Sequence, residues 1–120
     1  MSNKKILLAE DDTTMVSLLK TLLKMEGFEV VAIHADSNVL EEVKKEKPVV
    51  LLLDFHLGAQ NGLDVLDEIR SHDETRNVRV IMSSGASVEE ECMNRGANGF
   101  LMKPYMPDDL ISLLKQTIAT

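Results

Sequence analysis

The sequence predicts an α/β fold: a doubly wound, five-stranded parallel sheet with five helices packed on its two faces. Short apolar runs, typical of strands buried on both sides, alternate along the chain with segments in which apolar residues recur every three or four positions, as in amphipathic helices. Right-handed crossovers leave few topologies for such an alternation. The leading one has strand order 2-1-3-4-5 and three layers, helix on sheet on helix.

Start and stop signals place the elements along the chain. Asp12 or Thr13 can cap the first helix, and Gly27 follows its end. Ser37-Asn38 opens the second helix, which cannot continue through Pro48. In order, the predicted elements are strand 6–9, helix 13–26, strand 29–34, helix 38–47, strand 49–54, helix 63–70, strand 78–82, helix 87–95, strand 99–102 and helix 107–118.

The strand predicted at 49–54 is the centre of this arrangement. Its five apolar residues leave no polar face, so both of its sides must be covered. Asp54 then lies at the C-terminal end of the strand, where open parallel sheets place their ligand crevice. Taken alone, Asp54 could equally begin a turn.

Composition narrows the classes of function. The 120 residues predict one domain, 1–120, and a net charge of -7 argues against nucleic acid or an anionic membrane as a direct partner. No apolar run approaches the roughly 20 residues that span a bilayer, and the first residues lack a signal-peptide pattern. The single cysteine, Cys92, fits a reducing compartment, so the sequence predicts a cytoplasmic location.

Polar residues follow four of the five predicted strands at the same edge of the sheet. Glu10 and Asp11 follow the first, Asp54 ends the third, Ser84 follows the fourth and Lys103 the fifth. Each has an ordinary explanation by itself, such as a helix cap, a turn or a solvated charge. Their joint placement at the ligand-binding edge instead predicts a site.

The residue types at this edge suit one chemistry. Neighbouring carboxylates repel each other by roughly 1–4 kcal/mol per pair at surface-like dielectrics, and an oxygen-binding cation such as Mg²⁺ relieves that repulsion. Lys103 supplies a positive charge and Ser84 a hydroxyl donor, both of which suit a phosphoryl group. A carboxylate can also act as the nucleophile. The sequence therefore predicts a Mg²⁺-dependent phosphoryl acceptor with Asp54 as the attacking group.

The pattern resembles the receiver domain of two-component response regulators, a CheY-like module with the flavodoxin-like strand order, over essentially the whole chain. The resemblance rests on the spacing of Glu10-Asp11-Asp12, Asp54, Asn61-Gly62, Ser84-Gly85, Gly96-Ala97-Asn98-Gly99-Phe100 and Lys103-Pro104.

This resemblance implies roles for the residues of the acidic site. It implies that Asp54 is the phosphoacceptor and Asp11 a direct Mg²⁺ ligand. Glu10 would hold the metal mainly through water, and the backbone carbonyl of His56 would complete the metal site. Gly58 stands where many family members have proline, so the loop after Asp54 is expected to be looser here.

The resemblance also implies a switch. Ser84 would bond the phosphoryl oxygen after transfer, Lys103 would pair with it across a cis Lys103-Pro104 bond, and Phe100 would turn inward when Ser84 moves. The expected output is a shift between conformational states of one surface, which is formed by helix 87–95, strand 99–102 and helix 107–118.

The implied partners are a sensor histidine kinase or a histidine phosphotransfer protein, and a downstream effector protein or fused output domain. A phosphodonor is expected to dock near Met15, Val16 and Tyr105, beside the acids. Direct binding to nucleic acid or membrane is not expected. The chain is expected to be a monomer or a phosphorylation-dependent dimer, and a signalling protein without enzymatic turnover.

Three other classes stay open at this point. A flavin-binding module would need a phosphate-cradling loop after the first strand, where three acids stand instead. A Mg²⁺-dependent nuclease or topoisomerase-like domain fits an acidic chain poorly. A Mg²⁺-dependent hydrolase or phosphatase with an aspartyl nucleophile is the main alternative, although it would typically carry a second acid where His56 stands.

Overall fold

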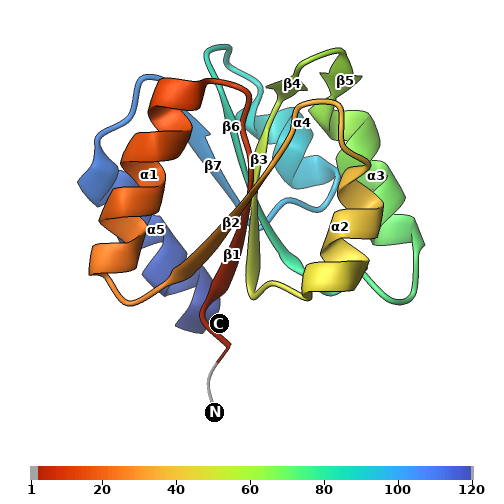
Figure 1. Cartoon of the computed structure of the whole chain (residues 1–120). Helices are drawn as coiled ribbons and strands as arrows, with labels where there is room; N and C mark the ends of the chain where they lie inside the picture. The colour runs from red at the N-terminus through yellow and green to blue at the C-terminus, as the bar shows by residue number, and fades with distance from the viewer. Residues whose placement is uncertain (1–2, 120) are drawn as a thin grey trace.

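A five-stranded parallel sheet forms the middle layer of the protein (Figure 1). The computed structural model describes residues 3–119. The strands of this sheet are β1 (Lys5–Ala9), β2 (Glu29–Ile33), β3 (Val50–Asp54), β6 (Arg79–Ser84) and β7 (Gly99–Met102). Their spatial order is β2-β1-β3-β6-β7, which is the predicted order 2-1-3-4-5.

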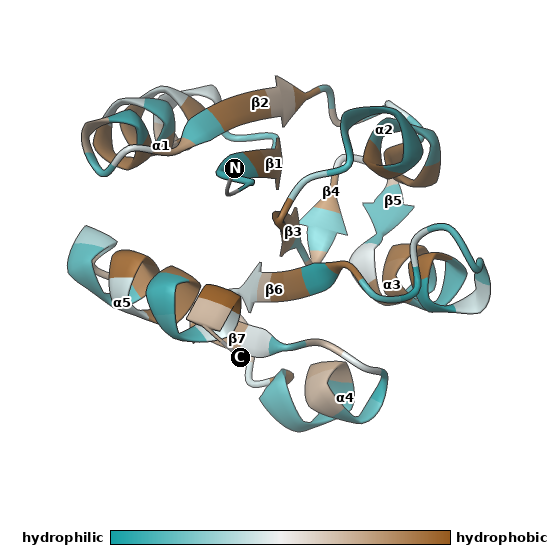
Figure 2. Ribbon diagram, turned by 90° about the horizontal axis from the view of Figure 1, so that it is seen from below, coloured by the Kyte–Doolittle hydropathy of each residue, from teal (hydrophilic) through white to brown (hydrophobic). Residues whose placement is uncertain are grey.

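Helices cover both faces of the sheet, as Figure 2 shows end-on. Their bounds are α1 (Thr13–Met25), α2 (Val39–Glu46), α3 (Gly62–Ser71), α4 (Glu89–Asn94) and α5 (Pro107–Ala119). Helices α1 and α5 lie on one side, and α2, α3 and α4 lie on the other. The three-layer α/β prediction is therefore confirmed. No helix within residues 3–119 is long and apolar enough to cross a membrane.

Strand β3 supplies both hydrophobic cores because its side chains alternate between the two faces. Leu51 and Leu53 pack into the core beneath α2, α3 and α4, whereas Val50 and Leu52 pack into the core beneath α1 and α5. All five residues of the strand are buried. This position explains its unbroken apolar sequence.

Side-chain caps fix where three helices begin. Asp12 accepts hydrogen bonds from the backbone N–H groups of Thr14 and Met15, at 3.0 and 3.1 Å, and Thr13 is the first helical residue. Asp12 is therefore the cap of α1. Asn38, one of the two residues predicted to open α2, is its cap, and Asn61 caps α3 in the same way.

The helix predicted at 87–95 is shorter in the structure, where α4 spans Glu89–Asn94, and two other segments hold more strand than predicted. The stretch after Asp54 holds a small antiparallel hairpin, β4 (His56–Leu57) and β5 (Gln60–Asn61), where a loop was predicted. Strand β6 also continues to Ser84 and does not end at residue 82, because Ser83 pairs with Asp54 and Ser84 pairs with Met102. Pairing with two neighbouring strands extends β6 past its apolar residues.

The opposite edge of the sheet is held by Arg70 at the end of α3. Its guanidinium donates two hydrogen bonds to the carbonyl of Gly96, one each to the carbonyls of Arg76 and Val78, and one to the side chain of Asn98. The bond lengths range from 2.6 to 3.0 Å. One side chain therefore joins α3, the start of β6 and the α4–β7 connection.

Gly62, the first residue of α3, allows this helix to approach the end of β3. A Cβ atom there would lie 2.7 Å from the carbonyl oxygen of Asp54 and 2.8 Å from the Cα of Phe55. Both contacts are with backbone atoms, which cannot move away by a change of side-chain rotamer. We expect Gly62→Ala to lower the free energy of unfolding by about 2–3 kcal/mol in urea denaturation.

Gly85→Ala is the matched control for this prediction. Gly85 does not have a positive φ, and a Cβ there would meet no atom within 4 Å. Its effect should stay within about 0.5 kcal/mol. If both substitutions lowered the free energy of unfolding equally, the close approach of α3 to β3 at Gly62 would not explain the loss of stability.

Candidate functional site

The carboxyl ends of the parallel strands bring the predicted polar residues to one edge. Glu10 follows β1, Asp54 ends β3, Ser84 ends β6 and Lys103 follows β7. Ala9 and Leu53 are paired across β1 and β3, so the next residues, Glu10 and Asp54, leave the sheet side by side. Glu10 and Asp54 are only 6% and 7% exposed.

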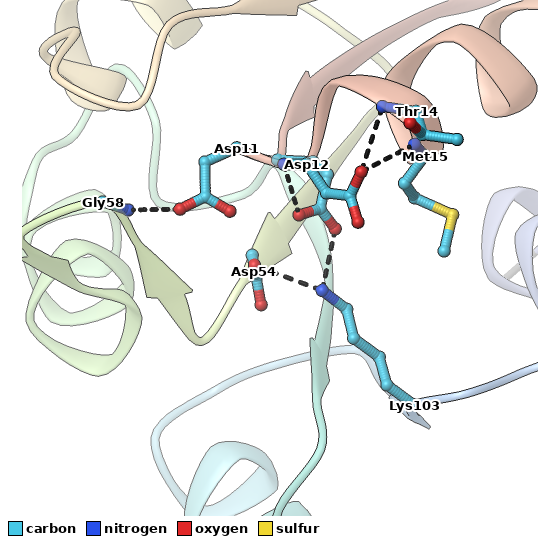
Figure 3. Close-up of polar contacts among 8 residues, drawn as sticks. Asp11, Asp12, Thr14, Met15, Asp54, Gly58 and Lys103 are labelled. Carbon is cyan, nitrogen blue, oxygen red and sulfur yellow. Dashed lines mark hydrogen bonds and ion pairs between the residues drawn. The ribbon is translucent and has the colours of Figure 1, made fainter.

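Lys103 joins the two buried acids, as Figure 3 shows for Asp54. Its Nζ lies 2.8 Å from Oε1 of Glu10 and 3.2 Å from Oδ2 of Asp54. The other Glu10 oxygen, Oε2, accepts a hydrogen bond from the backbone N–H of Asp12 at 3.2 Å. Both oxygens of Glu10 therefore already have protein donors.

Burial and charge shift the pKa of the central groups. Burial, followed by the nearby charge of Glu10, raises the pKa of Asp54 from 3.8 to about 6, against the opposing charge of Lys103. Burial favours a lower pKa for Lys103, but the hydrogen bond to Glu10 and the charge of Asp54 outweigh it and raise that pKa. The lysine therefore stays charged while the carboxyl it contacts titrates near neutrality.

A third acid completes an oxygen-rich cluster. One carboxylate oxygen from each of Glu10, Asp11 and Asp54 lies within 4.8 Å of the others. Asp11 is exposed, and its Oδ2 accepts a hydrogen bond from the backbone N–H of Gly58 at 3.0 Å (Figure 3). Clustered hard oxygen donors, partly open to water, fit the ligand preference of Mg²⁺.

Ser84 is buried at this edge, and its side chain contacts the loop that follows β6. Its Oγ accepts a hydrogen bond from the backbone N–H of Ala86 at 3.1 Å. Its carbonyl accepts the backbone N–H of Lys103 at 2.8 Å, so the residues that follow β6 and β7 are tied together. The Lys103-Pro104 bond is cis, as the resemblance implied.

The two remaining predicted residues are not members of the acidic cluster. Phe100 is half-buried on β7, pairs with Met82, and packs against the core beneath α2, α3 and α4. His56 is exposed on β4, and its ring stands edge-on to that of Phe55, with centroids 4.9 Å apart.

The bond from Gly58 to Asp11 was not predicted, and it corrects the expectation of a looser loop. A hydrogen bond between residues so distant in the sequence leaves no periodic signal. The visible signal was the glycine itself, whose φ of +57° is one that other residues rarely adopt. Gln60 also anchors the hairpin, through hydrogen bonds to the carbonyls of Ala35 and Ser37.

Comparison with known proteins gives a consistent result. Residues 6–115 match the family described as the response regulator receiver domain. The transcriptional regulatory protein CpxR of Klebsiella pneumoniae is 34% identical over 112 residues, covering 92% of this chain and 47% of CpxR. The DNA-binding response regulator MtrA of Mycolicibacterium smegmatis is 28% identical, over 93% of this chain and 49% of MtrA.

A solved structure agrees with both sequence matches. The CheY-like response regulator receiver domain protein of Methanospirillum hungatei superimposes with a TM-score of 0.85 at 30% identity, over 98% of this chain and 95% of that one. The chain spans about half the length of the curated relatives named above.

The raised pKa of Asp54 predicts an unusual dependence of stability on pH. Because the folded-state pKa, about 6, exceeds the ordinary value of 3.8, the folded protein retains a proton that the unfolded chain releases. This contribution to stability is fully present below about pH 4 and is lost as the pH rises through about 6. In chelator, Asp54→Asn should therefore become more stable than wild type across this range, by about 1–2 kcal/mol at pH 7 after allowance for solvent screening.

Urea denaturation at several pH values measures the difference. Asp36→Asn, which removes an exposed carboxylate, controls for the loss of one negative charge. If both variants differ from wild type by the same amount at every pH, then burial of Asp54 is not the source of the effect.

Proposed function

This chain belongs to the response regulator receiver domain family, and on that premise we propose that it accepts a phosphoryl group on Asp54 in a Mg²⁺-dependent phosphorelay. The observation that carries the proposal is the buried Asp54 carboxylate, held 3.2 Å from the Lys103 ammonium within a cluster of acids. With a pKa of about 6, Asp54 is mostly ionised at pH 7 and available as a nucleophile.

The proposed step is transfer from a phosphohistidine. An oxygen of the Asp54 carboxylate attacks phosphorus and forms a P–O bond while the P–N bond to the imidazole breaks. The bonding electron pair stays on the imidazole nitrogen, which takes up a proton. The product is an aspartyl phosphate. The ammonium of Lys103 contacts Asp54 and would form an ion pair with the added negative charge.

The proposed magnesium ligands are Asp11 and Asp54, with Glu10 acting through water and His56 through its backbone carbonyl. Bound Mg²⁺ would neutralise charge on the phosphoryl oxygens. The indirect role of Glu10 is supported by its two occupied oxygens, one on Lys103 and the other on the backbone of Asp12. Hydrogen bonds from Lys103 and from backbone N–H groups thus already orient the acidic side chains before a phosphodonor binds.

We infer that the switch passes through Ser84 and Phe100 to the surface of α4, β7 and α5. The Ser84 hydroxyl oxygen accepts the N–H of Ala86, and the Ser84 carbonyl accepts the N–H of Lys103. Movement of Ser84 would therefore shift the loop that follows β6 and the loop that follows β7. The surface that would respond carries exposed methionines, a residue type suited to adaptable partners: Met93, Met102 and Met106.

The proposed partners follow from the family. The phosphodonor would be a sensor histidine kinase or a histidine phosphotransfer protein, docking near Met15, Val16 and Tyr105. The output would be an effector protein or a fused domain, a role suggested by the DNA-binding relative MtrA. Residues 1–120 would act as one receiver domain in the cytoplasm, as a monomer or a phosphorylation-dependent dimer, without contacting nucleic acid or membrane directly.

Incubation with acetyl phosphate and Mg²⁺, followed by intact-mass measurement, tests the proposal. Wild type should gain one phosphoryl group, Asp54→Asn none, and wild type in chelator little or none. Lys103→Met should reduce incorporation by about 10²-fold or more, because removing one charged donor aimed at a developing negative charge typically costs that much.

The same assay examines the alternative function. Continuous release of inorganic phosphate without a phosphorylated protein would favour a hydrolase with an aspartyl nucleophile and would contradict the receiver proposal. Asp64→Asn, on the exposed side of α3, is the matched control and should incorporate phosphate like wild type.

A further inference from the structure

Asp11 is held differently from the other two acids of the cluster. Glu10 and Asp54 share the ammonium of Lys103, whereas the structure gives Asp11 no ion pair within residues 3–119. Its donor is the backbone N–H of Gly58, at 3.0 Å and 47 residues further along the chain. An exposed carboxylate is thus tied to the hairpin that follows Asp54.

The position of Gly58 is itself fixed by its surroundings. It lies in the two-residue turn between β4 and β5 with a φ of +57°, and a Cβ there would lie 3.0 Å from the Cβ of Ala35. On the other side of the turn, the Gln60 amide donates to the carbonyl of Ala35 at 2.6 Å and to that of Ser37 at 2.9 Å. The turn is therefore held against the connection between β2 and α2.

The tie has a directional consequence for Asp11. A carboxylate has two oxygens, and the bond to Gly58 uses Oδ2. In Figure 3 the other oxygen turns to the side of Asp54. A neutral amide donor orders the side chain without cancelling its charge, whereas a lysine or arginine partner would cancel the charge that attracts a cation.

We propose that the Gly58 amide is a positioning group for Mg²⁺: it orders the Asp11 carboxylate before the ion arrives and leaves one oxygen turned toward Asp54. The inference rests on the proposed function, because it takes Asp11 as a metal ligand. Prior ordering of a ligand strengthens binding by reducing the entropy lost when the complex forms. The affinity for Mg²⁺ should therefore depend on one backbone N–H outside the acids themselves.

An amide-to-ester replacement tests the proposal without adding a side chain. Glycolic acid in place of Gly58 exchanges the N–H donor for an ester oxygen. Lactic acid in place of Ala59, the other turn residue, introduces the same ester linkage one position later and is the matched control. Mg²⁺ binding is measured by isothermal titration calorimetry, and the melting temperature is measured in chelator. We expect the Gly58 ester to bind Mg²⁺ about tenfold more weakly, with the control within about twofold of wild type.

A second measurement examines the bond itself in the ion-free protein. Asn can still accept the Gly58 N–H through its side-chain oxygen, whereas Ala cannot. Exchange of the Gly58 amide hydrogen with solvent should therefore be about tenfold faster in Asp11→Ala than in Asp11→Asn. Equal exchange rates in the two variants would show that Asp11 does not hold this amide.

The outcomes separate this inference from the proposed function. If wild type binds Mg²⁺ and accepts a phosphoryl group but the Gly58 ester binds Mg²⁺ like the Ala59 ester, only the positioning role is overturned. Wild type that binds no Mg²⁺ at millimolar concentration overturns both. An ester that melts far below the control in chelator and binds Mg²⁺ like wild type assigns Gly58 a structural role alone, which also overturns the inference.

Discussion

The placement of two buried carboxylates around one ammonium is the constraint on which the rest of the structure depends. Parallel pairing of β1 with β3 forces Glu10 and Asp54 to leave the sheet together, where they repel each other. Lys103, two strands away, offsets that repulsion through contacts of 2.8 and 3.2 Å. Asp54 nevertheless keeps a raised pKa, chiefly because it is buried and secondly because of the charge of Glu10. A further positive charge near the two acids would favour their ionised forms.

The ends of β6 and β7 carry this balance into the backbone. The carbonyl of Ser84 accepts the N–H of Lys103, and the carbonyl of Ser83 accepts the N–H of Phe55. Main-chain hydrogen bonds therefore join Lys103, which contacts Asp54, to the end of β6. They also join Phe55, which follows Asp54, to the same strand.

Much of the fold and the site could be predicted because both follow from patterns that the chain carries locally. Runs of apolar residues mark the buried strands, and the right-handed crossover rule converts their alternation with helices into the observed strand order. Asp54 and Lys103 could be placed at one edge because they follow such runs. Two of the features that could not be predicted depend on neighbours distant in the sequence, namely the extension of β6 through Ser83 and the bond from Gly58 to Asp11. A third, the hairpin after Asp54, is local but too short to leave a periodic pattern. The bond from the N–H of Ala86 to the hydroxyl oxygen of Ser84 is also local, but it depends on how the chain turns after β6, which the apolar pattern does not specify.

Arg70, at the edge of the sheet far from the acids, has a consequence for how this sequence can vary. Three of the groups that accept its hydrogen bonds are main-chain carbonyls, which every amino acid provides. Positions 76 and 78 can therefore diverge without loss of these bonds. Position 96 cannot, because its φ of +102° and the nearby guanidinium favour glycine there. Lysine cannot replace Arg70, because it lacks the planar fork of donors that reaches several carbonyls at once. Among homologous sequences, we therefore expect Arg70 and Gly96 to persist or be lost as a pair.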